Sequence, residues 1–201
     1  MILALLLAQA SAVDAERAFE ADAQRLGQWT AFRKWAADDA EMFWPQPVMA
    51  QEKLRKLSDP AKSVERRTAR SFVSCDGLTA ANTGPTRWPD GRIGYFSTVW
   101  SKGDDRWRWT LDHGDLTTTT HWGEPAEPIV QRAACKQKAM TDTLLEITGD
   151  YSLISRSSAD DTLRYSRRVM RDGSRRLTVR LWNGRDFDTV IDDQVAAPPV
   201  P

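Results

Sequence analysis

The chain has 201 residues, of which 41% are hydrophobic, so it can form one large domain with a substantial core, or a domain with a small addition. Its 28 basic residues balance its 28 acidic residues, whereas a nucleic-acid-binding protein usually carries a basic excess or patch, so we expect no nucleic-acid partner. No apolar run approaches the roughly 20 residues that span a bilayer, so no membrane span is expected.

The first twelve residues are predicted to be a signal peptide. Residues 2–8 form a short apolar run, and Ala8, Ala10 and Ala12 provide the small side chains of two overlapping cleavage sites. No Lys or Arg precedes the run, so the alternative is that it forms the buried first turn of a helix. The first interpretation predicts a periplasmic or secreted protein, and the second a cytoplasmic one.

Residues 13–37 have the periodicity of a helix with one interruption. Phe19, Ala23 and Leu26 recur at steps of three and four residues, which places them on one helical face. Asp14 is a suitable N-cap, and Gly27 predicts a kink or a break into two helices. A short strand at 41–44 and a short helix at 51–57 are expected to follow.

The chain from residue 65 to 115 predicts four antiparallel strands. The first two, at 65–75 and 78–88, are joined by the hairpin signal Asp76-Gly77. The last two lie within 92–115 and are joined by a polar turn. Because helices come first and strands follow, we expect an α+β fold in which N-terminal helices pack in a strongly curved antiparallel sheet, a cone.

The remainder of the chain is predicted to be a linker and a second group of strands. Residues 117–148 look like a linker with a short helix at about 130–140. Residues 149–195 alternate β-rich runs with turn residues, which indicates an extra antiparallel β meander. Within it, Asn183-Gly184 favours a two-residue type I′ hairpin turn, and residues 196–201 are expected to form a disordered tail.

Two segments resemble the SnoaL-like and nuclear transport factor two-like superfamily: AERAFEADAQRLGQWTAFRKWAADDAEMFWPQPVMAQEKL and GYFSTVWSKGDDRWRWTLDHGD. Members share a helix that runs into an ADDA-hydrophobic strand start, here residues 37–40, and a late strand ending in Asp-His, here Asp112-His113. The resemblance covers residues 15–115 and implies a cone domain over 13–116 with a pocket at its open end. The superfamily includes isomerases, cyclases, dehydratases and non-catalytic members, so the fold alone assigns no activity.

The central strand carries the candidate catalytic residues. Strand alternation predicts that Trp107, Trp109, Leu111 and His113 share one face, while Arg108, Thr110 and Asp112 share the other. His113 is then expected at the mouth of the cone, where it could act as an acid or base together with Asp112. The alternatives are that His113 only makes a structural hydrogen bond and that Asp112 and Asp115 cap the strand end.

The aromatic residues of the cone segment suggest a ligand-binding wall. Nine tryptophans in the chain would suit an apolar or aromatic ligand, or would simply fill the core. Arg33 follows Trp29 by one helical turn and could bind an anionic group, or lie at the surface. The predicted ligand-binding residues are Trp29, Arg33, Trp44, Tyr95 and Trp109.

Cys75 and Cys135 are the two cysteines of the chain. In an exported protein they would form one disulfide, and in a cytosolic protein two buried thiols. Two cysteines and the distant His113 and His121 have no metal-ligand spacing, so no metal site is expected. The sequence also lacks a Gly-rich phosphate loop and a nucleophile elbow, and no cofactor is predicted.

Three functions are compatible with these features. The leading one is an exported SnoaL-like protein that binds a small, partly apolar molecule in the cone pocket. The second is a lyase, isomerase or cyclase that uses His113 and Asp112 for proton transfer. The third is an interaction module, such as a homodimer, formed by the outer sheet face with Arg108 and Thr110 and by the added meander.

Overall fold

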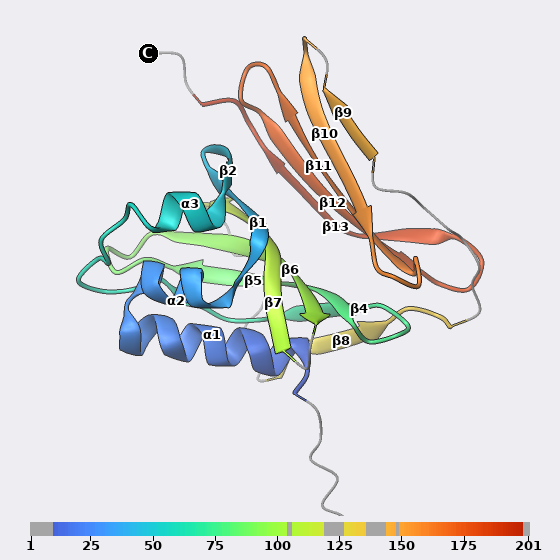
Figure 1. Cartoon of the computed structure of the whole chain (residues 1–201), viewed down its shortest axis with the longest axis horizontal. Coiled ribbons are helices and arrows are strands. Elements are labelled where there is room, and N and C mark those ends of the chain that lie inside the picture. Colours follow the sequence, from blue (N-terminus) through green and yellow to red (C-terminus); the bar gives the residue numbers. More distant parts are fainter. Residues whose placement is uncertain (1–9, 104–105, 119–126, 136–143, 148, 199–201) are drawn as a thin grey trace, which may run out of the picture.

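The described part of the chain forms two β-sheets and three helices. The computed structural model describes residues 10–103, 106–118, 127–135, 144–147 and 149–198, the side chains of 144–147 excepted. The helices lie on one face of the first sheet, and the second sheet lies on the opposite face (Figure 1). The protein therefore belongs to the α+β class that the order of helices and strands predicts. None of the described helices is long and apolar enough to cross a bilayer.

The N-terminal helical region is two helices, α1 (Ala12–Leu26) and α2 (Gln28–Trp35), separated at Gly27. Gly27 has a φ of +107°, and its Cα lies so close to the Asp59 carboxylate that a Cβ would clash with it. That carboxylate accepts hydrogen bonds from the first turn of α2, from Trp29 N at 2.6 Å and Thr30 N at 3.0 Å. The predicted break at Gly27 is thus confirmed and has a partner in the loop that follows α3 (Ala50–Leu54).

The N-cap of α1 is Ser11 rather than the predicted Asp14. The Ser11 hydroxyl accepts from Asp14 N at 3.2 Å, and the Asp14 carboxylate accepts from Ser11 N at 2.9 Å. This reciprocal pair is a capping box, in which Asp14 occupies the third helical position. Ala12, which the sequence places in the signal peptide, is a buried residue of α1.

The first sheet has eight strands, of which seven follow the order β2-β1-β7-β6-β5-β4-β8. Its long strands are β5 (Thr79–Arg87), β6 (Ile93–Gly103) and β7 (Arg106–Leu116), which pair antiparallel as predicted. At one edge β1 (Ala36–Trp44) pairs parallel with β7 and antiparallel with β2 (Gln46–Met49). The predicted first strand, 65–75, is divided into β3 (Glu65–Arg66) and β4 (Arg70–Val73).

The other edge of the first sheet corrects the prediction of a helix at 130–140. Its first residues belong to strand β8 (Ile129–Arg132), which pairs parallel with β4. A β-branched pair, Ile129 and Val130, opens this strand and favours the extended conformation over the helix. Residues 136–143 lie outside the described residues, as do 119–126 of the predicted linker and 199–201 of the predicted tail.

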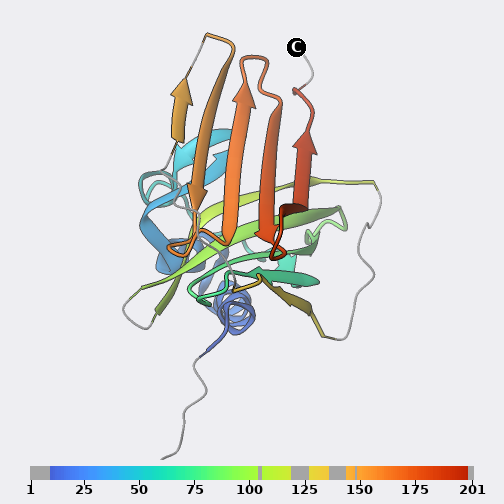
Figure 2. The ribbon, with the colours of Figure 1, turned by 90° about the vertical axis from the view of Figure 1, so that its right-hand side faces the viewer.

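The second sheet is an antiparallel meander of five strands, in the order β13-β12-β11-β10-β9. In Figure 2 its strands stand upright and cross those of the first sheet at a steep angle. Their bounds are β9 (Leu144–Ile147), β10 (Tyr151–Ser157), β11 (Leu163–Met170), β12 (Arg175–Trp182) and β13 (Phe187–Val195).

The turn between β12 and β13 is longer than the predicted two-residue hairpin. Trp182 pairs with Phe187, so four residues form the loop. The Asn183 side-chain oxygen accepts from the backbone N–H groups of Arg185 and Asp186, each at 2.9 Å. This Asx-type arrangement satisfies the loop backbone, so the wider turn needs positive φ only at Gly184, where it is +100°.

Two hydrophobic cores lie on opposite faces of the first sheet. The helical core, between the sheet and the helices, includes Phe19, Phe32, Met42, Trp100 and Trp109. The intersheet core, between the two sheets, includes Phe72, Val99, Leu111, Leu177 and Val179. The second sheet is therefore an integral layer of the fold. It covers the face of the first sheet that lies opposite the helices.

A β-bulge in β7 reverses the face of every later side chain in that strand. Trp100 pairs with Trp109 and Val99 pairs with Leu111, so Thr110 is an extra residue without an opposite partner. Trp109 belongs to the helical core, whereas Leu111 belongs to the intersheet core. The predicted single face from Trp107 to His113 is therefore wrong beyond the bulge.

A disulfide joins Cys75, in the turn between β4 and β5, to Cys135, three residues beyond β8. The Cys75 backbone N–H also donates to the Thr162 hydroxyl, in the turn before β11, at 2.8 Å. The disulfide thus fixes one corner of the first sheet, and the hydrogen bond connects that corner to the turn that leads into the second sheet.

Candidate functional site

A cavity of about 260 Å³ opens at one end of the first sheet, beside α2. Its lining comes from α2, from β1, from the segment around β3, and from the ends of β5, β6 and β7. Aromatic side chains dominate the walls, and charged groups lie at the base. The lining includes Trp29, Phe32, Met42, Phe43, Trp44, Arg66, Thr86, Trp88, Tyr95, Phe96, Asp112 and Asp115.

The aromatic wall is built from contacting rings. Trp29 packs edge-on against Trp44, with ring centroids 5.3 Å apart, and against Phe32 at 5.5 Å. Trp44 is 40% exposed and forms part of the rim, where the Lys53 ammonium lies 4.5 Å from its ring centroid. These rings give the cavity an apolar surface that is fixed by the helical core beneath it.

Arg66 is the central charged residue at the base of the cavity. Its guanidinium is 5% exposed and lies over the Phe96 ring at 4.1 Å, with Phe19 and Phe32 also nearby. Nη2 donates to Asp112 Oδ2 at 2.8 Å and to the Thr98 hydroxyl, which in turn donates to the same Asp112 oxygen at 2.7 Å. Burial of a charge requires such pairing.

Glu16 of α1 stands behind Arg66, in the helical core. Its Oε1 lies 3.3 Å from Arg66 Nη2, and its Oε2 accepts from the Trp100 indole N–H at 2.7 Å. Asn82 donates to the same oxygen at 3.4 Å. Burial raises the pKa of Glu16 from 4.5 to about 7, although Arg66 and the Trp100 hydrogen bond act in the opposite direction. Glu16 therefore changes charge near neutral pH.

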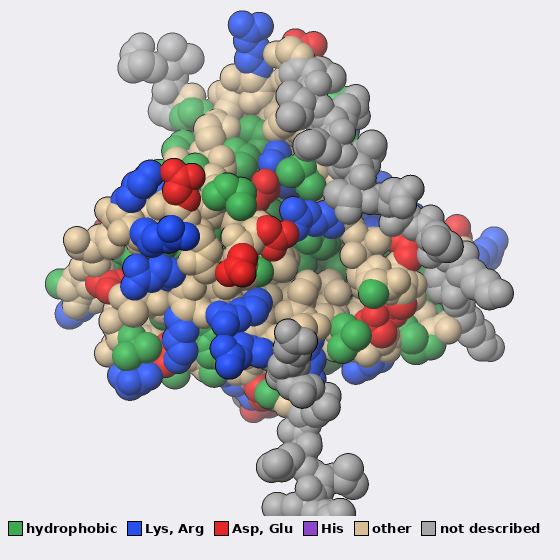
Figure 3. Space-filling model, in the orientation of Figure 1, with side chains coloured by type: hydrophobic (Ala, Val, Ile, Leu, Met, Phe, Trp, Pro, Cys, Tyr) green, Lys and Arg blue, Asp and Glu red, His purple; other side chains and the backbone are tan. Residues whose placement is uncertain are grey.

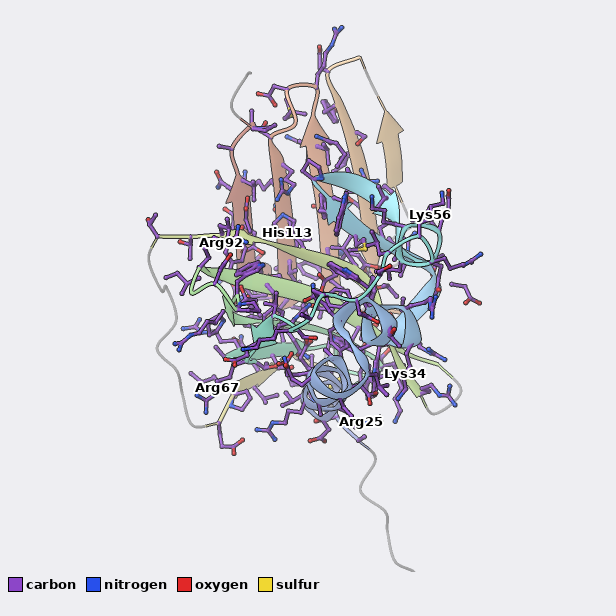
Figure 4. All side chains as sticks on the ribbon, turned by 90° about the vertical axis from the view of Figure 1, so that its left-hand side faces the viewer. Arg25, Lys34, Lys56, Arg67, Arg92 and His113 are labelled. Atoms are coloured by element: carbon purple, nitrogen blue, oxygen red, sulfur yellow. A yellow bond between two sulfur atoms is a disulfide. The ribbon has the colours of Figure 1, made fainter. Side chains whose placement is uncertain are left out.

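His113 lies where the first sheet meets the second (Figure 4). Its Nδ1 is 3.4 Å from Asp193 Oδ2, which belongs to β13, and its ring packs edge-on against Phe43 at 4.9 Å. The imidazole is fully buried, and no hydrogen bond to either ring nitrogen forms among the described residues. The bulge at Thr110 explains why His113 points away from the helical core.

Asp112 and His113 consequently lie on opposite faces of β7. Asp112 contacts Arg66 on the helical side, and His113 contacts Asp193 on the intersheet side. The predicted acid–base pair is therefore not brought together, because neighbouring residues of a strand point in opposite directions. Each residue also contributes to the lining of the cavity, which extends around the end of the sheet.

A second polar group joins the two sheets near the same end. Arg175 of β12 donates from Nη2 to Gly114 O and to Asp115 Oδ2, each at 3.3 Å. The nearby Tyr95 has a raised pKa, first because it is buried and then because Asp193 and Asp115 are close. Asp115 thus holds the second sheet in place and does not merely cap the strand end.

The predicted ligand-binding residues are divided by the structure. Trp29, Trp44 and Tyr95 line the cavity. Trp109 is fully buried, with its indole N–H donating to Phe32 O at 3.1 Å, so it is a core residue. Arg33 is exposed and does not line the cavity, which agrees with the surface alternative.

Sequence analysis missed the main polar residue of the cavity, Arg66, together with Glu16 and the rim residue Trp88. Arg66 belongs to the single strand predicted at 65–75, whereas the structure divides that segment into the separate strands β3 and β4. One local signal was present: Glu16 shares a helical face with Phe19 and Ala23, which marks a charged residue on the apolar side of α1.

The described residues contain no group of three or more His, Cys, Asp and Glu side chains that could hold a metal ion. His121 lies outside them.

On the face shown in Figure 3, Lys and Arg side chains are prominent over the helices, with Asp and Glu beside them.

Comparison with known proteins gives little further assignment. No family model matches the chain, and no curated protein matches it. A solved structure from Novosphingobium aromaticivorans, provisionally named an aromatic ring hydroxylase, is 14% identical, with a TM-score of 0.38 over 55% of this chain and 89% of that one. A likeness at this level assigns neither a family nor an activity to the chain.

Proposed function

We propose that this protein is an exported member of the SnoaL-like, cone-fold group that binds a small, partly apolar molecule in the cavity beside α2. The observation that carries the proposal is the combination of an aromatic wall, built from Trp29 and Trp44, with a buried ion pair between Arg66 and Asp112 at its base. Binding sites typically join an apolar concave surface to a few fixed polar groups.

A buried ion pair beside an open cavity favours a binding role over a purely structural one. Removing a charged pair from water costs several kcal/mol per ion unless close partners compensate, so a buried Arg–Asp pair is rarely retained for stability alone. Here the pair is accessible from the cavity, since the Asp112 side chain remains 14% exposed. A ligand that fills the cavity would exclude the remaining water from both groups.

Export is proposed on separate grounds. The disulfide between Cys75 and Cys135 is of the kind that persists in oxidising compartments. The mass of the protein isolated from its own host tests this point. A mature chain that begins near residue 11, with both thiols oxidised, supports export, and a chain with residues 1–10 intact and free thiols contradicts it.

The binding proposal is tested with two tryptophan variants. Trp44→Ala removes an exposed wall of the cavity and should weaken binding of small aromatic molecules at least tenfold, because roughly 2 kcal/mol of apolar contact is lost. Trp182→Ala is the matched control, since Trp182 lies in the second sheet beside Phe187, remote from the lining. Titration of each variant by isothermal calorimetry with a panel of one-ring aromatics distinguishes them. Equal binding by both variants would refute the site.

The other functions receive less support from the geometry. Proton transfer by His113 together with Asp112 is disfavoured by their opposite orientation. A partner surface on the outer face of the first sheet is disfavoured because the second sheet covers that face, where Thr110 lies 3.5 Å from the Tyr165 hydroxyl. A homodimer remains a prediction of the sequence alone.

A further inference from the structure

Arg66 has little capacity left for an incoming anion. Its guanidinium faces are covered by aromatic rings, at 4.1 Å for Phe96 and 5.1 Å for Phe19. Its Nη2 already faces Asp112, Thr98 and Glu16. Its Nε has no hydrogen-bond partner among the described residues, but this atom is fully enclosed, so a ligand in the cavity cannot reach it. A carboxylate ligand would need a free edge of the guanidinium for a bidentate pair, and it would approach two carboxylates that already hold this edge.

Asp112, in contrast to Arg66, has an oxygen that can accept a hydrogen bond from a ligand. Its Oδ2 accepts both hydrogen bonds, from Arg66 at 2.8 Å and from Thr98 at 2.7 Å. No described residue donates a hydrogen bond to its Oδ1. This oxygen is not fully enclosed by the protein. Asp112 lines the cavity. The open position at the base of the cavity is therefore a hydrogen-bond acceptor, held in one orientation by Arg66 and Thr98.

The charge balance at the base favours a neutral donor over a cation. Arg66 neutralises Asp112, and burial favours the neutral form of the second carboxyl group beside it, Glu16. An ammonium group on Oδ1 would therefore meet the guanidinium across the same carboxylate. A hydroxyl group brings no net charge and supplies one proton for a hydrogen bond to Oδ1. The surrounding rings, Trp29, Trp44 and Trp88, would stack on an aromatic body.

We infer that the ligand of this cavity is a neutral, hydroxyl-bearing aromatic molecule of the phenol class, whose hydroxyl donates to Asp112 Oδ1. This inference rests on the proposed binding function and adds the chemical class of the ligand. It also assigns Asp112 as the residue that determines specificity, with Arg66 and Thr98 as positioning residues.

The test uses four probes that share one body and differ in one group: 4-ethylphenol, 4-ethylanisole, 4-ethylbenzoate and 4-ethylbenzylammonium. Each is titrated into the full chain at neutral pH, and indole N–H signals in NMR spectra report the contact with tryptophan. A hydrogen bond to a carboxylate contributes about 1.5–3 kcal/mol. We therefore expect 4-ethylphenol to bind at least tenfold more tightly than each of the other three.

Asp112→Asn sharpens the test. Its amide oxygen would face Arg66 and Thr98, which places the amide NH₂ where Oδ1 stands and removes the acceptor. The preference for 4-ethylphenol over 4-ethylanisole should then fall to about one. Asp192→Asn is the matched control, since Asp192 pairs with Arg176 in the second sheet and does not line the cavity, and it should keep the preference.

The outcomes separate the two levels of the proposal. A preference for 4-ethylbenzoate or 4-ethylbenzylammonium, or equal binding of the phenol and the anisole, overturns the phenol assignment and leaves the binding function standing. Failure of all four probes to shift the tryptophan signals overturns both. If Asp112→Asn does not fold, the preference measured on the unmodified chain still decides the inference.

Discussion

Replacement of Glu16 by Gln should remove a large part of the pH dependence of stability. The carboxyl group is buried in the helical core, and its pKa rises from 4.5 in the unfolded chain to about 7 in the folded one, because burial opposes the charge. The folded state therefore binds this proton more tightly than the unfolded state. Stability from this group is fully present below pH 4.5 and is lost as the pH rises through 7.

The magnitude follows from the shift. A rise from 4.5 to about 7 corresponds to roughly 3 kcal/mol, at about 1.4 kcal/mol for each pKa unit. Gln does not titrate, and its side-chain oxygen can still accept from the Trp100 indole. The ion pair with Arg66 forms only when Glu16 is charged, so its effect is already contained in the pKa. Changes in packing and hydrogen bonding around the new amide add a cost that does not vary with pH. The quantity to compare is therefore the change with pH rather than the stability at one pH.

Urea unfolding at several pH values between 5 and 8 provides the assay. Between these limits the unmodified protein should lose about 2–3 kcal/mol more than Glu16→Gln. Glu52→Gln is the control, because Glu52 is exposed and pairs only with Lys56, and its profile should run parallel to that of the unmodified protein. Parallel profiles for Glu16→Gln and the unmodified protein would refute the assignment of a buried, titrating Glu16.

Three further predictions concern stability. Gly84→Ala should lower the melting temperature strongly, because an added Cβ would lie 1.9 Å from the Arg67 carbonyl oxygen, and differential scanning calorimetry measures this. Cys75→Ser and Cys135→Ser should each cost about 4 kcal/mol under oxidising conditions and nothing under reduction, since the bridge closes a loop with a sequence separation of 60; a loss that persists under reduction contradicts this. A chain that begins at Ser11 should keep its capping box, whereas one that begins two residues later should lose about 1 kcal/mol in urea unfolding.

Local sequence signals were sufficient for much of the helical and strand assignment. The break at Gly27 and the antiparallel β4–β7 meander follow from periodicity and turn residues. The Cys75–Cys135 link required only two cysteines and an assumed oxidising environment. These features depend on residues near one another in the sequence, or on the only pairing that the composition allows.

The features that were missed depend on long-range structure. The bulge at Thr110 has no glycine to mark it. At the bulge, Thr110 lies near Tyr165 of the second sheet, and Leu111 belongs to the intersheet core. One extra residue moved His113 from the helical face of the first sheet to the intersheet face. Alternation over a strand therefore cannot be extended without knowing what covers each face.

The burial of Arg66 likewise depends on residues that are distant in the sequence. An arginine in a polar run is normally a solvent-facing residue, and its own segment provides no sign of burial. Its partners, Glu16, Thr98 and Asp112, come from a helix and two strands that are 32–50 residues away. Only the assembled fold brings them to one point, and this is why the base of the cavity was not predicted.

Native mass spectrometry of the protein purified from its own host without denaturation tests the central claim most directly. The unmodified protein should carry a small molecule that is absent or strongly reduced in Trp44→Ala and retained in Trp182→Ala, because Trp44 lines the cavity and Trp182 does not. The mass of that molecule would also identify its class. An unmodified protein that is empty, or a bound molecule retained equally in both variants, would contradict the assignment of the cavity beside α2 as a binding site.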